Sequence, residues 1–318
     1  MTATDRRSYL VAYGAFALLA LIWGFSYILI KVGVQAMPAT VVVLIRCGSG
    51  AITMLLAFAV LRRNPWAPGT RGRLPAFLLM ALTSSVIPFI AITWGQYYIT
   101  TGLASILNAT TPLWTAIFAW WVTPSERPSR VNYLGVAAGF AGTAILIGPQ
   151  LVTDPFKASA LAGLAVLLGA ASYSVAALGQ RRLLSGVDPV DATLWQLVIA
   201  SLLMLVIAAP ALPSAHPDAR AIGAVVLLGT AGSAFAYILY YHVLNALGGT
   251  RGSSVTFVIP ITAIFWGALL FGERLALPTV AGMGVILAGI VLTSIRRGSA
   301  GSHASPDARP EQAEPGPG

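Results

Sequence analysis

Long apolar segments, separated by short polar ones, constrain the fold of this chain more than any other feature. Hydrophobic residues make up 57% of its 318 residues and charged residues 9%, whereas about a quarter of an ordinary soluble domain is charged. An apolar segment of about 20 residues crosses a bilayer as a helix. We therefore expect an all-α integral membrane protein, and these values exclude a soluble enzyme with one large core.

The apolar segments predict ten transmembrane helices. The expected ranges are 12–33, 39–61, 75–98, 102–122, 131–148, 158–179, 192–212, 221–244, 252–271 and 277–295. The first segment is longer than the apolar core of a signal peptide and lacks a cleavage site of small residues, so we expect it to be retained.

The basic residues predict an orientation. If the N-terminus lies inside, the ten segments put fourteen of the nineteen basic residues on the inner side and leave Arg46 within the second segment. The outer side then holds Lys31, Lys157, Arg220 and Arg274. Since Lys and Arg accumulate on the cytoplasmic side of membrane proteins, both termini are expected in the cytoplasm.

Cysteine content and charge distribution narrow the expected partners. The single cysteine, Cys47, excludes a disulfide framework or a cysteine-based metal cluster, because both need at least two. The net charge of +9 does not indicate nucleic-acid binding, because the basic residues stand in small groups between apolar segments. We expect no metal, no cofactor and no nucleic acid, and we expect a small-molecule substrate and the lipid bilayer as partners.

The second half of the chain repeats features of the first. Pro112 corresponds to Pro260, and the pair Glu126-Arg127 to Glu273-Arg274. A repeat of five helices must enter the membrane from opposite sides in its two copies, which gives an inverted-topology repeat typical of alternating-access transporters. The expected parts are a cytoplasmic N-terminus (1–11), a first five-helix repeat (12–148), an outer linker (149–157), a second five-helix repeat (158–297) and a disordered cytoplasmic tail (298–318).

Several short motifs occur in a familiar order along these segments. They are Trp23-Gly24-Phe25-Ser26, Lys31, Pro38, Arg46, Pro112 and Glu126-Arg127 in the first half, and Pro260 and Glu273-Arg274 in the second. In this order the chain resembles the drug/metabolite transporter superfamily and its bacterial EamA-type members over about residues 10 to 297. The second half lacks an equivalent of the Trp-Gly pair. The resemblance implies an exporter of amino acids, other small metabolites or toxic compounds in the bacterial inner membrane.

Arg46 is the one charge well inside an expected span. Such a charge costs about 2.5 to 3.5 kcal/mol at mid-bilayer on insertion scales, so it needs acceptors from backbone carbonyls, water or a substrate carboxylate. Arg46 either locks helices together or contacts an anionic substrate group. No acidic residue was expected within a hydrophobic core.

Other polar and aromatic residues within the spans are candidates for a substrate path, because rings and a few polar groups suit an amphipathic ligand. Besides Arg46, the candidates are Trp94, Asn108, Thr111, Tyr173, Tyr237 and Thr256. Equally, aromatic residues near the ends of spans, among them Tyr97, Tyr98 and Trp121, are typical of an interfacial belt.

Prolines and glycines indicate bends and close contacts. Pro88, Pro112 and Pro260 are expected within helices, where each would bend the axis, with or without a role in gating. The small residues at Gly135, Gly139 and Gly142, and the related pattern near 282 to 289, favour close helix packing within the monomer or at a homodimer face.

The leading hypothesis is a secondary transporter that exports small amphipathic metabolites, first among them aromatic or hydrophobic amino acids. The alternatives are a multidrug or nucleoside-type exporter of the same fold and, with less support, a channel or structural membrane protein. An enzyme is not expected, because no convergent set of catalytic groups is evident in the spans.

Overall fold

The computed structural model describes residues 3–66, 69–122, 130–153, 157–248, 252, 254–274 and 276–294. These residues form helices and connections, with no strand among them. The expected disordered tail, 298–318, lies outside the described residues. The all-α prediction is confirmed for the part that the structure describes.

The helices follow the apolar segments in order along the chain. They are α1 (Ala3–Val34), α2 (Ala39–Val60), α3 (Leu74–Ala81), η1 (Leu82–Val86), α4 (Ile87–Gly95), α5 (Thr101–Asn108), α6 (Thr111–Val122), α7 (Arg130–Thr153), α8 (Ala158–Leu183), α9 (Pro189–Ala208), η2 (Ala209–Ser214), α10 (Ala219–Gly229), η3 (Thr230–Phe235), α11 (Ala236–Leu247), α13 (Val255–Phe271) and α14 (Leu277–Ser294).

Seven helical stretches in the described residues are long and apolar enough to cross a membrane. The helices at Val255–Phe271 and Leu277–Thr293 are apolar but shorter, and the expected helix 102–122 is divided into α5 and α6. The chain is thus a multi-pass membrane protein, and the count of ten spans stays a prediction.

Several helix boundaries differ from the expected ranges, most of all at α1 and α7. The first helix begins at Ala3, before the expected start at 12. Helix α7 continues to Thr153, past the expected end at 148 and into the expected linker, because Leu151 and Val152 extend the apolar sequence beyond Pro149.

One of the three prolines, Pro112, starts a helix, which corrects the expectation that all three lie within one. Pro88 lies within the continuous helical stretch Leu74–Gly95, directly after its π-helical segment η1, as expected. Pro112 is the second residue of α6, which follows a break in the helix. A proline is tolerated in a first turn because its missing N–H would have no partner in the helix there. Pro260 lies inside α13, as expected.

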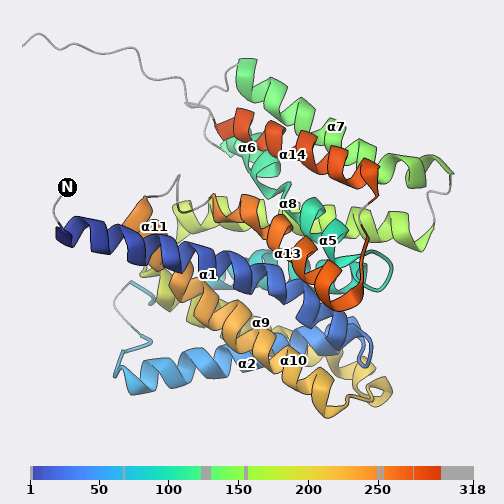
Figure 1. The fold of residues 1–318 in the computed structure, drawn as a ribbon. Helices are drawn as coiled ribbons and strands as arrows, with labels where there is room; N and C mark the ends of the chain where they lie inside the picture. The colour runs from blue at the N-terminus through green and yellow to red at the C-terminus, as the bar shows by residue number, and fades with distance from the viewer. Residues whose placement is uncertain are drawn as a thin grey trace, which may run out of the picture.

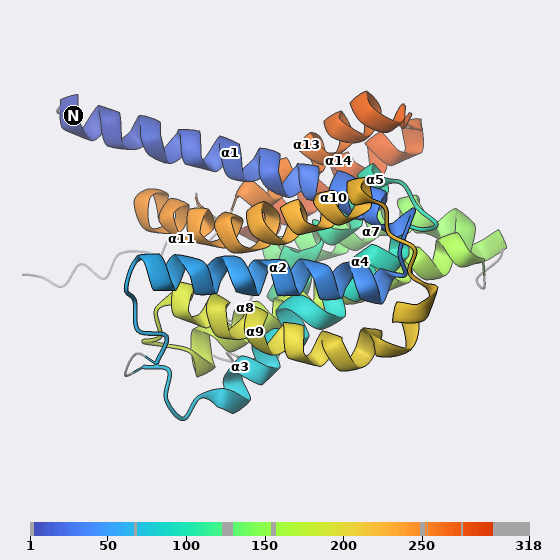
Figure 2. The same ribbon diagram turned by 90° about the horizontal axis from the view of Figure 1, so that it is seen from below.

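Helices from the two halves of the chain are interleaved rather than separated. Helix α1 packs against α10, α11 and α13, and α2 packs against α9 and α10. Figures 1 and 2 show α1 and α2 side by side with these later helices. The cavity described below is therefore built from both halves.

Helices α7 and α14 form a separate pair at one side of the bundle (Figure 1). They meet through a glycine seam, which we define as Gly135, Gly139, Gly142, Gly282 and Gly289. A Cβ atom added at Gly142 would lie 2.8 Å from the carbonyl oxygen of Gly282. The two expected glycine patterns thus pack on each other within one chain, which is the first of the two packing modes predicted.

Candidate functional site

A cavity of about 220 Å³ lies among α1, α2, α4, α5, α6, α8, η3, α11 and α13. Six of the seven expected path residues line it, together with one of the three prolines. These are Arg46, Asn108, Thr111, Tyr173, Tyr237, Thr256 and Pro112. The structure thus brings together residues that are far apart in the sequence.

The seventh path residue and two prolines lie elsewhere. Trp94 is outside the cavity lining, and its ring packs edge-on against Tyr98 with the centroids 5.2 Å apart. Pro88 packs against α8 at Gly169, and Pro260 is buried inside α13. Trp94 is near the end of α4, so its ring is placed beside the following connection rather than at the cavity.

Arg46 is held in the cavity wall by two contacts that the sequence did not reveal. Its Nε donates a hydrogen bond to Ser233 Oγ at 3.0 Å, and its guanidinium carbon lies 3.5 Å from the centroid of the Phe89 ring. Neither a serine hydroxyl nor an aromatic face is among the partners considered from the sequence, which were backbone carbonyls, water and a substrate carboxylate. In the described part of the chain no acidic residue pairs with Arg46.

The remaining guanidinium N–H groups of Arg46 are free to bind a solute. Among the described residues, the bond from Nε to Ser233 is the one hydrogen bond that the Arg46 side chain donates. The side chain is only 7% exposed. A buried cation with free donors recognises an anionic group such as a carboxylate.

Asn108 supplies an acceptor to the same cavity. It is the last residue of α5, at the break before α6, where the chain turns before Thr111 and Pro112. Its Oδ1 atom is buried and has no hydrogen-bond partner among the described residues. Because a buried polar atom without a partner is costly, this oxygen is suited to accept a hydrogen bond from a ligand.

Aromatic rings form one wall of the cavity. The ring centroid of Trp23 lies 5.2 Å from that of Tyr240 and 6.1 Å from that of Tyr237. Tyr27 and Phe89 also line the cavity. Of these five residues, Tyr237 is one of the path candidates expected from the sequence.

In the sequence, the glycine that follows Trp23 is the feature that could have indicated that Trp23 faces the cavity. A side chain at Gly24 would collide with Thr262 of α13, whose hydroxyl donates to the Ala20 carbonyl oxygen at 2.8 Å. Gly24 therefore lets α13 approach α1 closely, and this contact sets the rotation of α1 that turns Trp23 to the cavity.

Charged side chains join the two halves at one end of the bundle. Arg63 Nη2 lies 2.7 Å from Asp188 Oδ2 and 3.0 Å from Asp191 Oδ1. Asp191, in the first turn of α9, is 3% exposed, so one carboxylate is buried, contrary to expectation. Its pairing with Arg63 offsets part of the lost hydration. Partial burial would raise the pKa of Asp188, but hydrogen bonds from Arg63 and the Val190 amide lower it.

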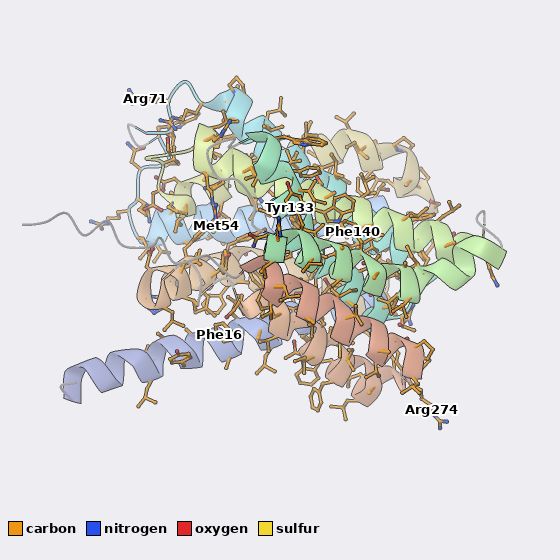
Figure 3. All side chains as sticks on the ribbon, turned by 90° about the horizontal axis from the view of Figure 1, so that it is seen from above. Phe16, Met54, Arg71, Tyr133, Phe140 and Arg274 are labelled. Carbon is orange, nitrogen blue, oxygen red and sulfur yellow. The ribbon has the colours of Figure 1, made fainter. Side chains whose placement is uncertain are left out.

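A second charged contact joins the halves where α5 begins. Glu273 accepts hydrogen bonds from the amides of Thr101, at 3.0 Å, and Gly102, at 3.3 Å. It thereby caps the N-terminus of α5, where a negative charge is favourable. Arg274, the next residue, points away from the bundle (Figure 3).

Among the described residues, no group of three or more His, Cys, Asp or Glu side chains could hold a metal ion. The cavity offers one cation, one free acceptor, several hydroxyl groups and aromatic surface.

Comparison with known proteins shows the family to which the chain belongs. The sequence profile of the EamA-like transporter family matches residues 10–148 and again 160–295. The chain is 27% identical over 296 residues to the uncharacterized inner membrane transporter YedA of Escherichia coli (strain K12), covering 91% of this chain and 92% of that protein. It is 23% identical over 277 residues to the uncharacterized transporter YoaV of Bacillus subtilis (strain 168), covering 86% and 93%.

A solved crystal structure has the same overall fold. It superimposes with a TM-score of 0.61 at 16% sequence identity, and the match covers 91% of this chain and 97% of the other. The two matches of the family profile account for most of the sequence. The chain therefore belongs to the EamA-like transporter family.

Proposed function

We propose that this protein is a secondary transporter of the bacterial inner membrane that exports small amphipathic metabolites by alternating access. Amino acids with aromatic or hydrophobic side chains are the favoured substrates. The observation that carries the proposal is that Arg46 and the unpartnered Oδ1 of Asn108 belong to residues that line one cavity. A carboxylate at Arg46, an ammonium group at Asn108 and a side chain against the aromatic wall would satisfy all three features.

Cavity size and charge favour amino acids over the alternative, a multidrug or nucleoside-type exporter. The volume of about 220 Å³ is below the range of about 300 to 1,000 Å³ that is usual for sites of drug-sized ligands. Arg46 would also repel the positive charge of a cationic drug. A channel is less favoured, because a buried cation with free donors suits binding more than conduction.

The inverted repeat is part of the proposal. The family profile matches the chain twice, and α7 and α14 pack through the related glycine patterns of the two halves. These observations support ten spans in two five-helix repeats, with solute bound between them. The asymmetry of basic residues supports cytoplasmic termini. Because the glycine seam is used within one chain, we favour a monomer over a homodimer formed through this face.

The test is counterflow in proteoliposomes that contain only this protein, with labelled Phe, labelled Thr and a cationic dye, with and without a pH gradient. We expect Phe to exchange without chemical change and faster than the dye. Arg46→Gln should lower Phe counterflow about tenfold or more, since a hydrogen bond to a charged group contributes about 1.5 to 3 kcal/mol.

Arg62→Gln is the matched control, because it removes the same charge from an exposed position outside the cavity, and it should transport normally. If Arg46→Gln does not yield folded protein, Arg46→Lys keeps the charge and tests the geometry of the guanidinium. Folded Arg46→Gln protein with unchanged Phe counterflow, or a wild-type preference for the dye, would contradict an amino-acid site at Arg46.

A further inference from the structure

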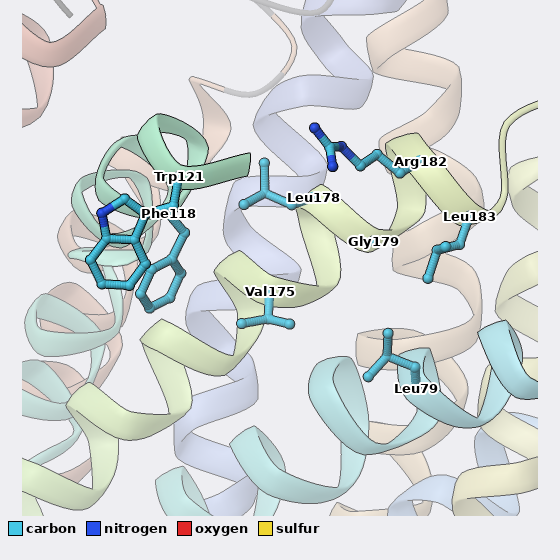
Figure 4. Close-up of a pocket in the computed structure, with 8 residues that line it drawn as sticks. All are labelled: Leu79, Phe118, Trp121, Val175, Leu178, Gly179, Arg182 and Leu183. Atoms are coloured by element: carbon cyan, nitrogen blue, oxygen red, sulfur yellow. The ribbon is translucent and has the colours of Figure 1, made fainter. Parts of the chain in front are cut away.

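A second hollow, the lateral groove, lies on the outside of the bundle between α3, α6 and α8 (Figure 4). Its volume is about 330 Å³. Apolar side chains of the three helices form its walls, and Arg182 is the one charged residue among them. The groove is separate from the central cavity, because the two share no lining residue.

One face of α8 forms the floor of the lateral groove. Val175, Leu178 and Arg182 follow each other at spacings of three and four residues, so they lie on the same side of the helix. Seven residues of helix span about 10 Å. The floor is thus apolar at Val175, which is 39% exposed, and positively charged at Arg182.

Arg182 is not needed to complete the end of α8. Arg73 already donates to the carbonyl oxygens of Leu183 and Ser185, at 2.8 and 2.9 Å. Within the described residues the exposed side chain of Arg182 has no hydrogen bond or ion pair. Its guanidinium group is therefore available to a ligand outside the chain.

Trp121 and Arg182 lie at the same end of the lateral groove. Helices α6 and α8 are joined where Ser174 Oγ donates to the Thr111 carbonyl oxygen at 2.8 Å, and Trp121 and Arg182 lie near their C-terminal ends, at the same end of the groove in Figure 4. Trp121 is 78% exposed. An exposed tryptophan beside an arginine is typical of the boundary between lipid tails and head groups.

We propose that the lateral groove binds one anionic phospholipid, with its phosphate at Arg182 and an acyl chain along Val175 and Leu178. The groove is apolar over most of its length and cationic at one end, which matches the charge and polarity of such a lipid. Basic pockets between transmembrane helices on the cytoplasmic side bind anionic head groups in this way. A second copy of the chain is a less suitable occupant, because it would leave the charge of Arg182 in an apolar contact.

The test is a titration of the delipidated full-length protein, followed by native mass spectrometry. The probes are phosphatidylglycerol and phosphatidylcholine with identical acyl chains, and glycerol 3-phosphate alone. We expect phosphatidylglycerol to bind wild type about fivefold more tightly than phosphatidylcholine, the effect of one basic residue near an anionic surface. Glycerol 3-phosphate should not bind measurably, because it lacks the acyl chains that fill the groove.

Arg182→Gln should abolish the preference for phosphatidylglycerol, and Arg182→Lys should retain most of it. Arg181→Gln is the matched control, since Arg181 is the neighbouring charge, is not part of the groove and lies near Tyr240 instead. Val175→Trp should weaken both lipids by filling the groove.

Three results would overturn the proposal. They are equal affinity of wild type for both lipids, equal losses in Arg181→Gln and Arg182→Gln, and unchanged binding in Val175→Trp. If Arg181→Gln retains the preference for phosphatidylglycerol and Arg182→Gln loses it, the effect belongs to this groove and not to the general positive charge of the chain.

Discussion

The two halves of the chain meet in two different ways, at the glycine seam and around the central cavity. At the seam, backbone touches backbone: a Cβ atom added at Gly289 would lie 2.5 Å from the amide nitrogen of Gly139. Around the cavity, large side chains such as Trp23 and Tyr237 keep the helices apart. The seam is therefore a fixed contact, whereas the cavity depends on side chains that can rearrange.

Because of this difference, substitutions at the glycine seam should change stability, whereas substitutions in the cavity should change transport. A close backbone contact has no adjustable part, so any added atom must push the helices apart. A cavity lined by rings and free polar groups tolerates a change of side chain but loses the ligand that matched it. Charged contacts at Arg63 and Glu273 tie the halves together beyond the cavity, near the α2–α3 connection and at α5, which lie at opposite ends of the bundle (Figure 2).

Breaking the glycine seam should have the largest effect. Gly289→Ala places a methyl group against the α7 backbone, and overpacking of this kind costs about 1 to 3 kcal/mol. We expect a clear drop in the thermal midpoint of the purified protein in detergent. Gly284→Ala, on the same helix but with open space around it, should leave the midpoint unchanged or raise it, because alanine favours a helix interior more than glycine does. Equal midpoints for both variants would contradict a tight seam.

Removing the free acceptor from the cavity should affect transport and not stability. Asn108→Leu deletes the unpartnered Oδ1 and should lower amino-acid counterflow about tenfold, while the thermal midpoint is unchanged or raised. The control is Thr93→Val, because Thr93 Oγ1 is also buried without a partner among the described residues but lies outside the cavity. Normal counterflow in Asn108→Leu would exclude Asn108 from ligand binding.

Loss of the Glu273 cap should loosen the start of α5. Glu273→Ala removes the acceptor for the amides of Thr101 and Gly102, which costs about 1 kcal/mol for a typical helix cap. Hydrogen exchange at these two amides should become faster, and Glu273→Gln, which keeps an acceptor oxygen, should show a smaller change. Unchanged exchange in Glu273→Ala would show that the cap does not hold this end of the helix.

The smallest effect is expected at the Arg63 pair, which is partly exposed. Arg63→Gln should cost about 1 kcal/mol or less at neutral pH. Because hydrogen bonds lower the pKa of Asp188 in the folded protein, the pair stabilises above the usual carboxyl pKa of about 3.9 and loses its effect as the pH falls through the lowered value.

Thermal midpoints of wild type and Arg63→Gln, measured from neutral pH to below the usual carboxyl pKa, test the direction of this pH dependence. The difference between wild type and Arg63→Gln should be full at neutral pH and shrink below about pH 4. Arg62→Gln, which removes a neighbouring charge that is outside this pair, should match wild type throughout. A difference that grows toward low pH would contradict the assigned direction.

Much of the fold and part of the candidate site could be predicted from local patterns. The apolar segments located the helices, and the glycines at 135 to 142 anticipated a close contact, because both signals are contained within one stretch of sequence. Arg46 and Asn108 stood out as polar residues in apolar surroundings. By contrast, the first-turn position of Pro112 depends on where the preceding helix ends, which the local pattern does not state.

By itself, the sequence determined that this is a helical membrane protein and which of its residues are too polar or too small to be ordinary lipid-facing positions. Hydropathy and residue size are local properties, so they can be read segment by segment. Only the tertiary structure decided that Arg46 meets Ser233, 187 residues away, and that Trp94 stays outside the cavity. Such contacts depend on the rotation of each packed helix, and that rotation is set by neighbours from the other half of the chain.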